Sequence, residues 1–437
     1  MVELVETTQP VEWTAMIRQV LTKTPNVERS GIVWNTIVGF WFTLQPTVIS
    51  FVIVRTLGAD VNGQFAYAVA QAYLFWGIGV YGMRRYQASD VTRRFTFADY
   101  LGSRVVTTVA MIAVGVAAVI HGWVTEEYGN QVILLILLVL GLRMVDTVED
   151  VYLGYFQQNG RLDIGSKLSA ARSIVSTLVI MVAIFVTDNV ALGLGLGVVS
   201  SALILAVLLP AAFVTPLTAE ERGFDWRRVW RLLLACAPLC AATVLAIYVA
   251  NAPRYAIRAT LDDAAQGYFF WLALAPFLIT LLSTIIFNPV ITRMATMWTS
   301  GDLATFIKWA RLLFLATAAV VAVALVGGML VGVPVLNFIT DLDFGGYRTE
   351  LLVLLLAGGL SAWAGLFATL LTIVRRQVWF TVGMATAGAV ALTGNLWVRR
   401  GELLGASWLY LALFAVQCLV LGVAFLVALR DRRRLHD

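Results

Sequence analysis

Long apolar stretches alternate with short polar stretches along the whole chain. A membrane-spanning helix needs about 20 consecutive, mostly apolar residues, and such stretches recur here between charged residues and turn formers. They lack the strict apolar–polar alternation of barrel strands that face lipid. The pattern therefore predicts twelve transmembrane helices, at residues 30–54, 62–83, 104–124, 131–157, 164–187, 190–214, 232–253, 265–292, 309–332, 349–374, 378–398 and 405–429.

A separate amphipathic helix is predicted before the first span. Its apolar residues recur three and four positions apart, which places them on one helical face, and Pro25 follows as a helix terminator. These residues are Trp13, Met16, Ile17, Val20 and Leu21. We expect the helix to lie on the membrane surface.

The composition narrows the class of protein. The 437 residues are 60% apolar and 13% charged, with a mean hydropathy of +0.84, whereas a soluble domain carries about 25% charged residues. A surface with so little charge would be largely bare hydrocarbon in water. This excludes soluble enzymes, nucleic-acid-binding proteins and disordered proteins. We expect an all-α integral membrane protein, and the net charge of +5 does not imply a nucleic-acid partner.

The basic residues predict an orientation. With the N-terminus inside, 24 of the 31 Lys and Arg residues fall in cytoplasmic segments and six fall outside, as the positive-inside rule requires. The densest cytoplasmic segment holds Arg84, Arg85, Arg93, Arg94 and Arg104. We therefore expect a multi-pass protein of the inner (cytoplasmic) membrane with both termini in the cytoplasm.

The spans divide into two halves at the most polar long break. This break predicts two pseudo-symmetric six-helix lobes. The expected segments are an amphipathic N-terminal segment (1–29), an N-lobe (30–214), an inter-lobe loop (215–231), a C-lobe (232–429) and a basic tail (430–437). Leu57, Gly63 and Phe65 match Leu261, Gly267 and Phe269 at an offset of 204 residues. Halves with an even number of spans share one orientation, which favours a cleft between two bundles that opens alternately to either side.

Catalytic and metal-ligating patterns are missing from the sequence. The chain has two His and three Cys residues, too few for a metal site of the usual ligands, and it has no phosphate-binding Gly-rich motif. Gly193, Gly195 and Gly197 lie inside a span, where close helix packing explains them. We expect no catalytic residues, no metal and no cofactor.

Several stretches resemble polysaccharide-unit flippases of the MOP (MATE-like) superfamily. They are residues 55–66 with Gly77, Gly82 and Arg84; Asn251 to Tyr255 with Gly267; Asn288-Pro289 with residues 300–303; Phe344 to Tyr347; and Gly394 to Leu396 with Gly401 and Gly405. The resemblance covers nearly the whole chain. It implies a two-lobe transporter that flips a polyprenyl-pyrophosphate-linked oligosaccharide from the inner to the outer leaflet for cell-surface polysaccharide assembly. Its implied partners are this lipid-linked oligosaccharide, membrane lipids, and a polysaccharide polymerase and glycosyltransferases.

Charged residues at membrane depth are the main candidates for function. Arg143, Asp146 and Asp150 follow a helical spacing that gives them one face, Glu149 is adjacent to that face, and Arg172 lies at a similar depth in the next span. In one interpretation the arginines neutralise the acids and tie two helices together. In the other this face lines the cleft, where the arginines bind phosphate. There the acids bind a proton or a cation, so that a proton or sodium gradient drives transport.

Further candidates lie near the ends of spans. The resemblance places Arg84 in the cytoplasmic vestibule, although positive-inside anchoring explains it equally. Arg254 and Arg258 break the positive-inside rule, so we expect them to contact lipid headgroups or to receive the pyrophosphate. Asn35 and Gln71 are polar within spans, where helix–helix hydrogen bonding and sugar contact are both open.

Two prolines within spans, Pro46 and Pro238, remove backbone hydrogen bonds and predict kinks that could act as hinges.

Two other classes of function stay open. A drug or metabolite exporter of the same fold would favour an acidic, aromatic cavity. An integral membrane enzyme of envelope glycan assembly could use the acidic pair Asp262-Asp263.

Overall fold

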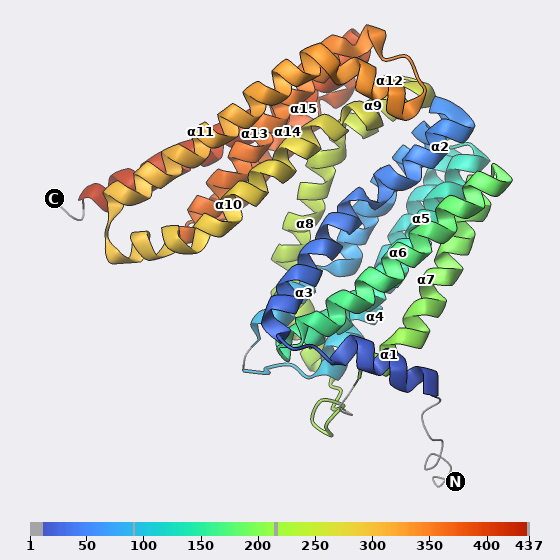
Figure 1. Ribbon diagram of the computed structural model, residues 1–437, viewed down its shortest axis with the longest axis vertical. Coiled ribbons are helices and arrows are strands. Elements are labelled where there is room, and N and C mark those ends of the chain that lie inside the picture. Colours follow the sequence, from blue (N-terminus) through green and yellow to red (C-terminus); the bar gives the residue numbers. More distant parts are fainter. Residues whose placement is uncertain (1–11, 91, 214–216, 435–437) are drawn as a thin grey trace. The chain divides into compact units, whose positions relative to one another are not determined.

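The computed structural model describes residues 12–90, 92–213 and 217–434, and every regular element in these ranges is a helix (Figure 1). Within these ranges, ten helices are long and apolar enough to cross a membrane. The one at Val27–Ser89 is 63 residues long and contains the first two predicted spans. A shorter apolar helix, Val378–Ala391, covers most of the predicted span 378–398. The all-α, twelve-span layout is therefore confirmed, and the chain is a multi-pass membrane protein.

Parts of four predicted segments lie outside the described residues. They are residues 1–11 of the N-terminal segment, residues 91 and 214 of the N-lobe, residues 215–216 of the inter-lobe loop and residues 435–437 of the basic tail.

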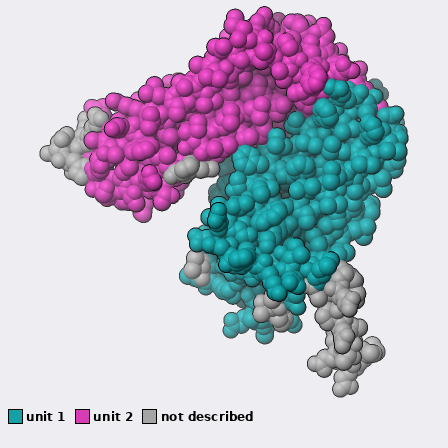
Figure 2. Space-filling view, viewed as in Figure 1, with its two compact units in different colours: residues 1–56, 68–244 teal, residues 57–67, 245–437 magenta. Residues whose placement is uncertain are grey.

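The chain folds into two compact units (Figure 2). Unit 1 contains residues 1–56 and 68–244, and unit 2 contains residues 57–67 and 245–437. The division therefore falls within a helix, after the predicted loop 215–231. The reason is packing: Val229, Leu232 and Cys236 are buried in one apolar cluster with Met83 and Tyr100 of unit 1.

Unit 1 is a bundle of long helices (Figure 1). Its elements are α1 (Glu12–Thr22), most of α2 (Val27–Val80), α3 (Met83–Ser89), α4 (Phe97–Val124), α5 (Asn130–Gln158), α6 (Leu162–Thr187), α7 (Val190–Ala212) and the first part of α8 (Trp226–Thr260). Helix α4 begins with a capping box, in which the Thr96 hydroxyl accepts from the Asp99 backbone amide and the Asp99 carboxylate accepts from the Thr96 amide.

Helix α1 contacts α6 and α7 at one end of the bundle (Figure 1). Ile17 and Leu21 pack into the apolar cluster of these helices, whereas Met16 and Val20 are 65% and 66% exposed. The apolar face predicted for this helix is thus divided between packing on unit 1 and an outward surface. The side chain of Trp13 lies outside the described residues.

Small residues let α6 and α7 approach closely. A methyl group at Gly193 would lie 2.5 Å from Ile184, and one at Gly197 would lie 2.3 Å from Ile180. Contacts this short do not occur between real side chains, so an added side chain at either position would force Ile180 or Ile184 to shift. The packing role predicted for Gly193 and Gly197 is confirmed, whereas Gly195 has only ordinary contact distances around it.

Unit 2 is built from residues 57–67 of α2 and from helices of the second half of the chain. Its elements are the last part of α8, α9 (Asp263–Leu272), α10 (Leu274–Ser300), α11 (Leu303–Gly327), a π-helical turn (Gly328–Gly332), α12 (Val333–Thr340), a 3-10 turn (Gly345–Tyr347), α13 (Arg348–Ile373), α14 (Val378–Ala391) and α15 (Gly394–Arg434). Asp302 caps α11, and its hydrogen bonds with Thr305 hold the pKa of the Asp302 carboxyl below its usual range.

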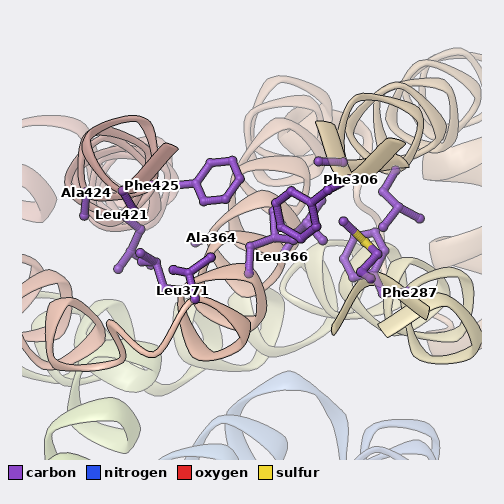
Figure 3. Packing of buried hydrophobic residues seen from close by; sticks show 14 residues of the cluster. Phe287, Phe306, Ala364, Leu366, Leu371, Leu421, Ala424 and Phe425 are labelled. Atoms are coloured by element: carbon purple, nitrogen blue, oxygen red, sulfur yellow. The ribbon is translucent and has the colours of Figure 1, made fainter. Parts of the chain in front are cut away.

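The core of unit 2 lies between α10, α11, α13 and α15 (Figure 3). Phe306 is fully buried, and its ring centroid lies 6.3 Å from that of Phe425. Leu371 and Leu421 belong to the same cluster and are also fully buried. Aromatic and branched side chains from four helices thus hold this unit together.

The repeated segments of the two halves meet within unit 2. A methyl group at Gly63 would overlap the carbonyl oxygen of Asp263, and one at Gly267 would overlap the carbonyl oxygen of Ala59. These contacts are reciprocal, because the offset of 204 residues relates Gly63 to Gly267 and Ala59 to Asp263. The break before each segment is also equivalent: α2 has non-helical dihedrals at Gly58 (φ 82°, ψ −172°), and Asp262 precedes α9 as its N-cap.

The predicted eleventh and twelfth spans differ from the observed helices. Helix α14 ends at Ala391, and a new helix begins at Gly394 and continues through a bend at Glu402 (φ 49°, ψ −131°). The end predicted at 398 and the start predicted at 405 lie on either side of this bend, whereas the interruption at residues 392–393 was not predicted. The charged residues Arg399, Arg400 and Glu402 mark this bend in the sequence, whereas apolar residues continue on both sides of the interruption at residues 392–393.

Candidate functional site

Arg172 of α6 lies at the centre of a buried ion-pair network in unit 1. Its Nη2 group donates to carboxylate oxygens of Asp146 at 2.5 Å and Glu149 at 2.7 Å. Its Nη1 group donates to the hydroxyl of Ser201 in α7 at 2.5 Å, and the Ser169 hydroxyl donates to Glu149 at 3.1 Å. These five residues are at most 7% exposed. The network connects α6 to α5 and α7.

Arg143 of α5 extends this network toward α2. It pairs with Asp146 at 3.0 Å, and its Nη2 group donates to the side-chain oxygen of Gln45 at 2.9 Å. Its guanidinium carbon lies 4.7 Å from the ring centroid of Phe42 and 4.9 Å from that of Tyr73. Gln45 in turn donates to Thr177 of α6 at 2.8 Å. Arg143 is 3% exposed, so its charge is held entirely within protein.

Two arginines and two acids thus neutralise one another. Such contacts are expected under the first interpretation given above, in which Arg143 and Arg172 neutralise the acids and tie two helices together. The phosphate-binding role predicted for the arginines and the ion-coupling role predicted for Asp146 and Glu149 remain predictions.

Asp150, although on the same helix, belongs to a separate group. Its Oδ2 atom accepts from Nη2 of Arg104 at 2.6 Å, and Nη1 of Arg104 donates to the Gly79 carbonyl oxygen at 2.6 Å. Arg104 is 1% exposed. The sequence predicted that Arg104 lies in a cytoplasmic loop segment. This prediction is wrong for its side chain, which lies inside unit 1. Its position near a helix start, close to the loop arginines, gave no signal of this burial.

Arg84 is held more loosely beside Asp150. Its Nε group donates to Gln157 at 3.3 Å and its Nη2 group to Asn35 at 3.4 Å. The distance from Nη1 to Asp150 is 4.0 Å, and the Arg84 side chain is 28% exposed. We call Asn35, Arg84, Asp150 and Gln157 the Arg84 cluster. It combines a partly solvated cation with amide groups.

Two further acids with structural contacts were not singled out from the sequence. Asp90 accepts from the backbone amides of Arg94 and Phe95 at 3.0 and 3.2 Å. Asp99 is fully buried and accepts from Nε of Arg228 at 2.7 Å, which joins α4 to α8. Only Asp99 had a sequence signal, the capping box with Thr96.

The outer candidates Arg254 and Arg258 both lie in unit 2. Arg258 pairs with Asp263 and lies 5.4 Å from the ring centroid of Tyr67. Arg254 lies 5.1 Å from the ring centroid of Phe270 and donates to Asn251 at 3.2 Å. Both guanidinium groups therefore lie over aromatic rings, and their roles in headgroup or pyrophosphate contact remain predictions.

The acidic pair has structural partners. Asp262 accepts from the backbone amide of Ala265 at 2.8 Å as the N-cap of α9. Asp263 pairs with Arg258 and also accepts from Gln64 at 2.9 Å. These contacts give both acids a role in holding the start of α9.

The remaining candidates have simpler surroundings. Gln71 is partly buried in α2. Pro46 lies inside α2, whose non-helical dihedrals are at Gly58, and Pro238 lies inside α8. Their role as hinges remains a prediction. Within the described ranges, no group of three His, Cys, Asp or Glu side chains could hold a metal ion.

Comparison with known proteins identifies the fold. No protein-family model matches the chain, and no curated protein matches its sequence. Solved structures do match it over nearly its whole length. An inward-facing multidrug-resistance MATE family transporter of the MOP superfamily has a TM-score of 0.66 at 13% identity, covering 97% of this chain and 99% of the transporter.

Two further structures agree. The lipid II flippase MurJ, in an inward closed conformation, has a TM-score of 0.67 at 10% identity, covering 92% of this chain and 90% of the flippase. The eukaryotic MATE transporter AtDTX14 has a TM-score of 0.60 at 13% identity, covering 97% and 99%. The chain therefore has the fold of the MOP-superfamily transporters.

Proposed function

We propose that the chain is a flippase that moves a polyprenyl-pyrophosphate-linked oligosaccharide from the cytoplasmic to the outer leaflet by alternating access, without covalent chemistry. The shared fold with both MATE transporters and a lipid II flippase supports transport. The sequence resemblance to polysaccharide-unit flippases supports the substrate. In this proposal both termini are cytoplasmic, and a proton or sodium gradient acts through Asp146, Glu149 or Asp150.

The observation that carries this proposal is the contrast between Arg84 and Arg172. The contacts of Arg172 to its acids are 2.5–3.1 Å long and fully buried. The contacts of Arg84 are 3.3–4.0 Å long and partly solvated. A guanidinium group held by long contacts can exchange them for a bidentate bond to phosphate, which is short and charge-assisted. Arg84 is therefore our candidate for the first phosphate contact, with Asn35 and Gln157 beside it for sugar hydroxyls.

The test is leaflet translocation of a labelled polyprenyl-pyrophosphate oligosaccharide by the purified chain in proteoliposomes. We expect the Arg84→Gln variant to slow translocation about tenfold or more, because a charge-assisted hydrogen bond contributes about 1.5–3 kcal/mol. The matched control is Arg85→Gln, which removes the same charge from the neighbouring, exposed position of α3. No translocation by the unmodified chain, with or without an ion gradient, would contradict the proposal.

One structural feature favours a second candidate, the export of aromatic cations. Phe42, Tyr73 and Trp76 form an aromatic group in α2, with ring centroids 5.4–6.4 Å apart. Aromatic faces bind organic cations. Under this alternative, Trp76→Ala would abolish uptake of a cationic dye into inverted vesicles, and Arg84→Gln would leave that uptake intact.

A further inference from the structure

A surface hollow lies at the bend of α15 in unit 2. Its volume is about 550 Å³, and its lining includes Leu396, Trp397, Arg400, Gly401, Leu404 and Trp408. It is separate from the Arg84 cluster and from the buried network of unit 1. None of the contacts described above uses its lining side chains.

The bend shapes this hollow. Residues before Glu402 fold back on those after it, and a methyl group at Gly405 would overlap the carbonyl oxygen of Trp397. The Trp397 indole donates to the Thr393 hydroxyl at 3.1 Å, which fixes the ring on its own helix. Glu402 adopts φ 49°, a conformation that L-residues rarely take. The two limbs of the bend therefore form the walls of a fixed depression.

The bend lies at the end of the membrane-crossing helices. A methyl group at Gly394, where α15 begins, would lie 3.1 Å from Ala256 near the end of α8, so the start of α15 lies on the same side of unit 2 as the turn at 261–262. Tryptophan and arginine at the ends of spans lie at the level of lipid headgroups. Phosphate groups of the bilayer are therefore the anions nearest to this hollow.

The chemistry of the lining combines one cation with apolar surface. Leu396, Trp397 and Trp408 are 58%, 37% and 45% exposed. Arg400 is exposed, and within the described part of the chain no hydrogen bond or ion pair involves it. Leucine and tryptophan side chains suit an acyl chain, and an exposed guanidinium suits a phosphate.

We propose that this hollow binds an anionic glycerophospholipid of the surrounding bilayer. The lipid phosphate lies at Arg400, and one acyl chain follows Leu396, Leu404 and Trp408. The lining of the hollow shares no residue with the Arg84 cluster, and the site holds lipid whether or not the chain is a flippase.

The experiment is native mass spectrometry of the full chain in detergent, with dioleoyl-phosphatidylglycerol or dioleoyl-phosphatidylcholine added. We expect the unmodified chain to retain phosphatidylglycerol. The Arg400→Gln variant should bind this lipid about fivefold more weakly, as expected for the loss of one interfacial arginine. Arg399→Gln is the matched control, because it removes the same charge from an exposed neighbour that does not line the hollow.

A second variant tests the shape of the site. An added side chain at Gly401 meets no atom within 4 Å, so Gly401→Leu should fill the hollow and displace the lipid while every charge is kept. Leu404→Trp serves the same purpose if Gly401→Leu does not fold. Equal losses in Arg399→Gln and Arg400→Gln, retention by the filled variants, or displacement of the lipid by millimolar inorganic phosphate would each overturn the proposal.

Discussion

The arginines of unit 1 differ in how completely their charge is compensated within the protein. Arg172 makes contacts with two buried carboxylates and a hydroxyl, whereas Arg84 retains solvent and long contacts. Removing one partner of a buried pair leaves the other charge desolvated and uncompensated. Removing a solvated arginine has little such cost. Substitution of Arg172 should therefore lower stability, whereas substitution of Arg84 should slow transport with little loss of stability.

We predict that Arg172→Gln lowers the free energy of unfolding by about 3–5 kcal/mol, because Asp146 and Glu149 stay buried without this counter-charge. Thermal unfolding in detergent, followed by tryptophan fluorescence, measures the effect. The double variant Arg172→Gln with Glu149→Gln should recover part of the loss. A melting temperature of Arg172→Gln equal to that of Arg85→Gln would contradict the structural role.

The sequence predicted part of this site. The helical spacing of Arg143, Asp146 and Asp150 on α5, with Glu149 adjacent and Arg172 at a similar depth, predicted one group of charges. Four of these charges lie close together in the structure, whereas Asp150 pairs with Arg104 instead. The partners Arg104, Gln45 and Ser201 could not be predicted, because they come from other helices and follow no local period. Which charges pair depends on helix rotation, and hydropathy does not encode it.

At the scale of elements, the bends and close crossings depend on particular backbone positions. Gly58 takes a positive φ that other residues rarely adopt, and it separates the two spans of α2. Five residues later, Gly63 removes the side chain that would prevent contact with α9. One short segment of α2 thus carries both a break and a crossing.

We predict that Gly63→Ala and Gly267→Ala each lower stability by about 1–3 kcal/mol, since the added methyl group must push apart two backbones. Gly39→Ala in the same helix meets no atom within 4 Å. That control should be neutral or stabilising by up to about 1 kcal/mol, through helix propensity. Thermal unfolding of the three variants side by side is the measurement, and equal melting temperatures would refute the crossing.

The limits of sequence-based prediction are clear at this scale. Apolar length located the spans because each needs a continuous hydrophobic stretch. It also located the bend at Glu402, because Arg399, Arg400 and Glu402 interrupt the apolar pattern there. It missed the restart of the helix at Gly394, because Leu392 and Leu396 keep the pattern apolar on both sides. Where backbone dihedrals rather than side-chain polarity interrupt a helix, hydropathy gives no signal.

At the scale of the whole molecule, the distribution of charge predicts the orientation. Basic residues are concentrated in the segments that the twelve-span topology places on one side, and the turn at 341–347 falls on the opposite side. This pattern predicts that residues 217–225 face the cytoplasm.

Single-cysteine labelling tests that orientation. With Cys236, Cys240 and Cys418 replaced by serine, we predict that a membrane-impermeant maleimide labels Gly346→Cys in intact cells. Glu220→Cys should react only after permeabilisation. Both positions are exposed, so the two cysteines are equally accessible to a reagent on their own side. Reversed labelling would invert the topology, and labelling of both would refute the span count.

The reciprocal contact of Gly63 and Gly267 has the form of an isologous interface, in which each partner presents the same patch to the other. Such an interface normally joins two identical subunits, where every substitution occurs twice. Here both patches lie in one chain, so each can change alone: Asn62 corresponds to Gln266 and Gln64 to Tyr268, while the glycines at the crossing are kept on both sides. The contact therefore has the reciprocal geometry of a dimer interface, but the residues around it need not be identical in the two repeats. Each repeat can consequently bind a different group.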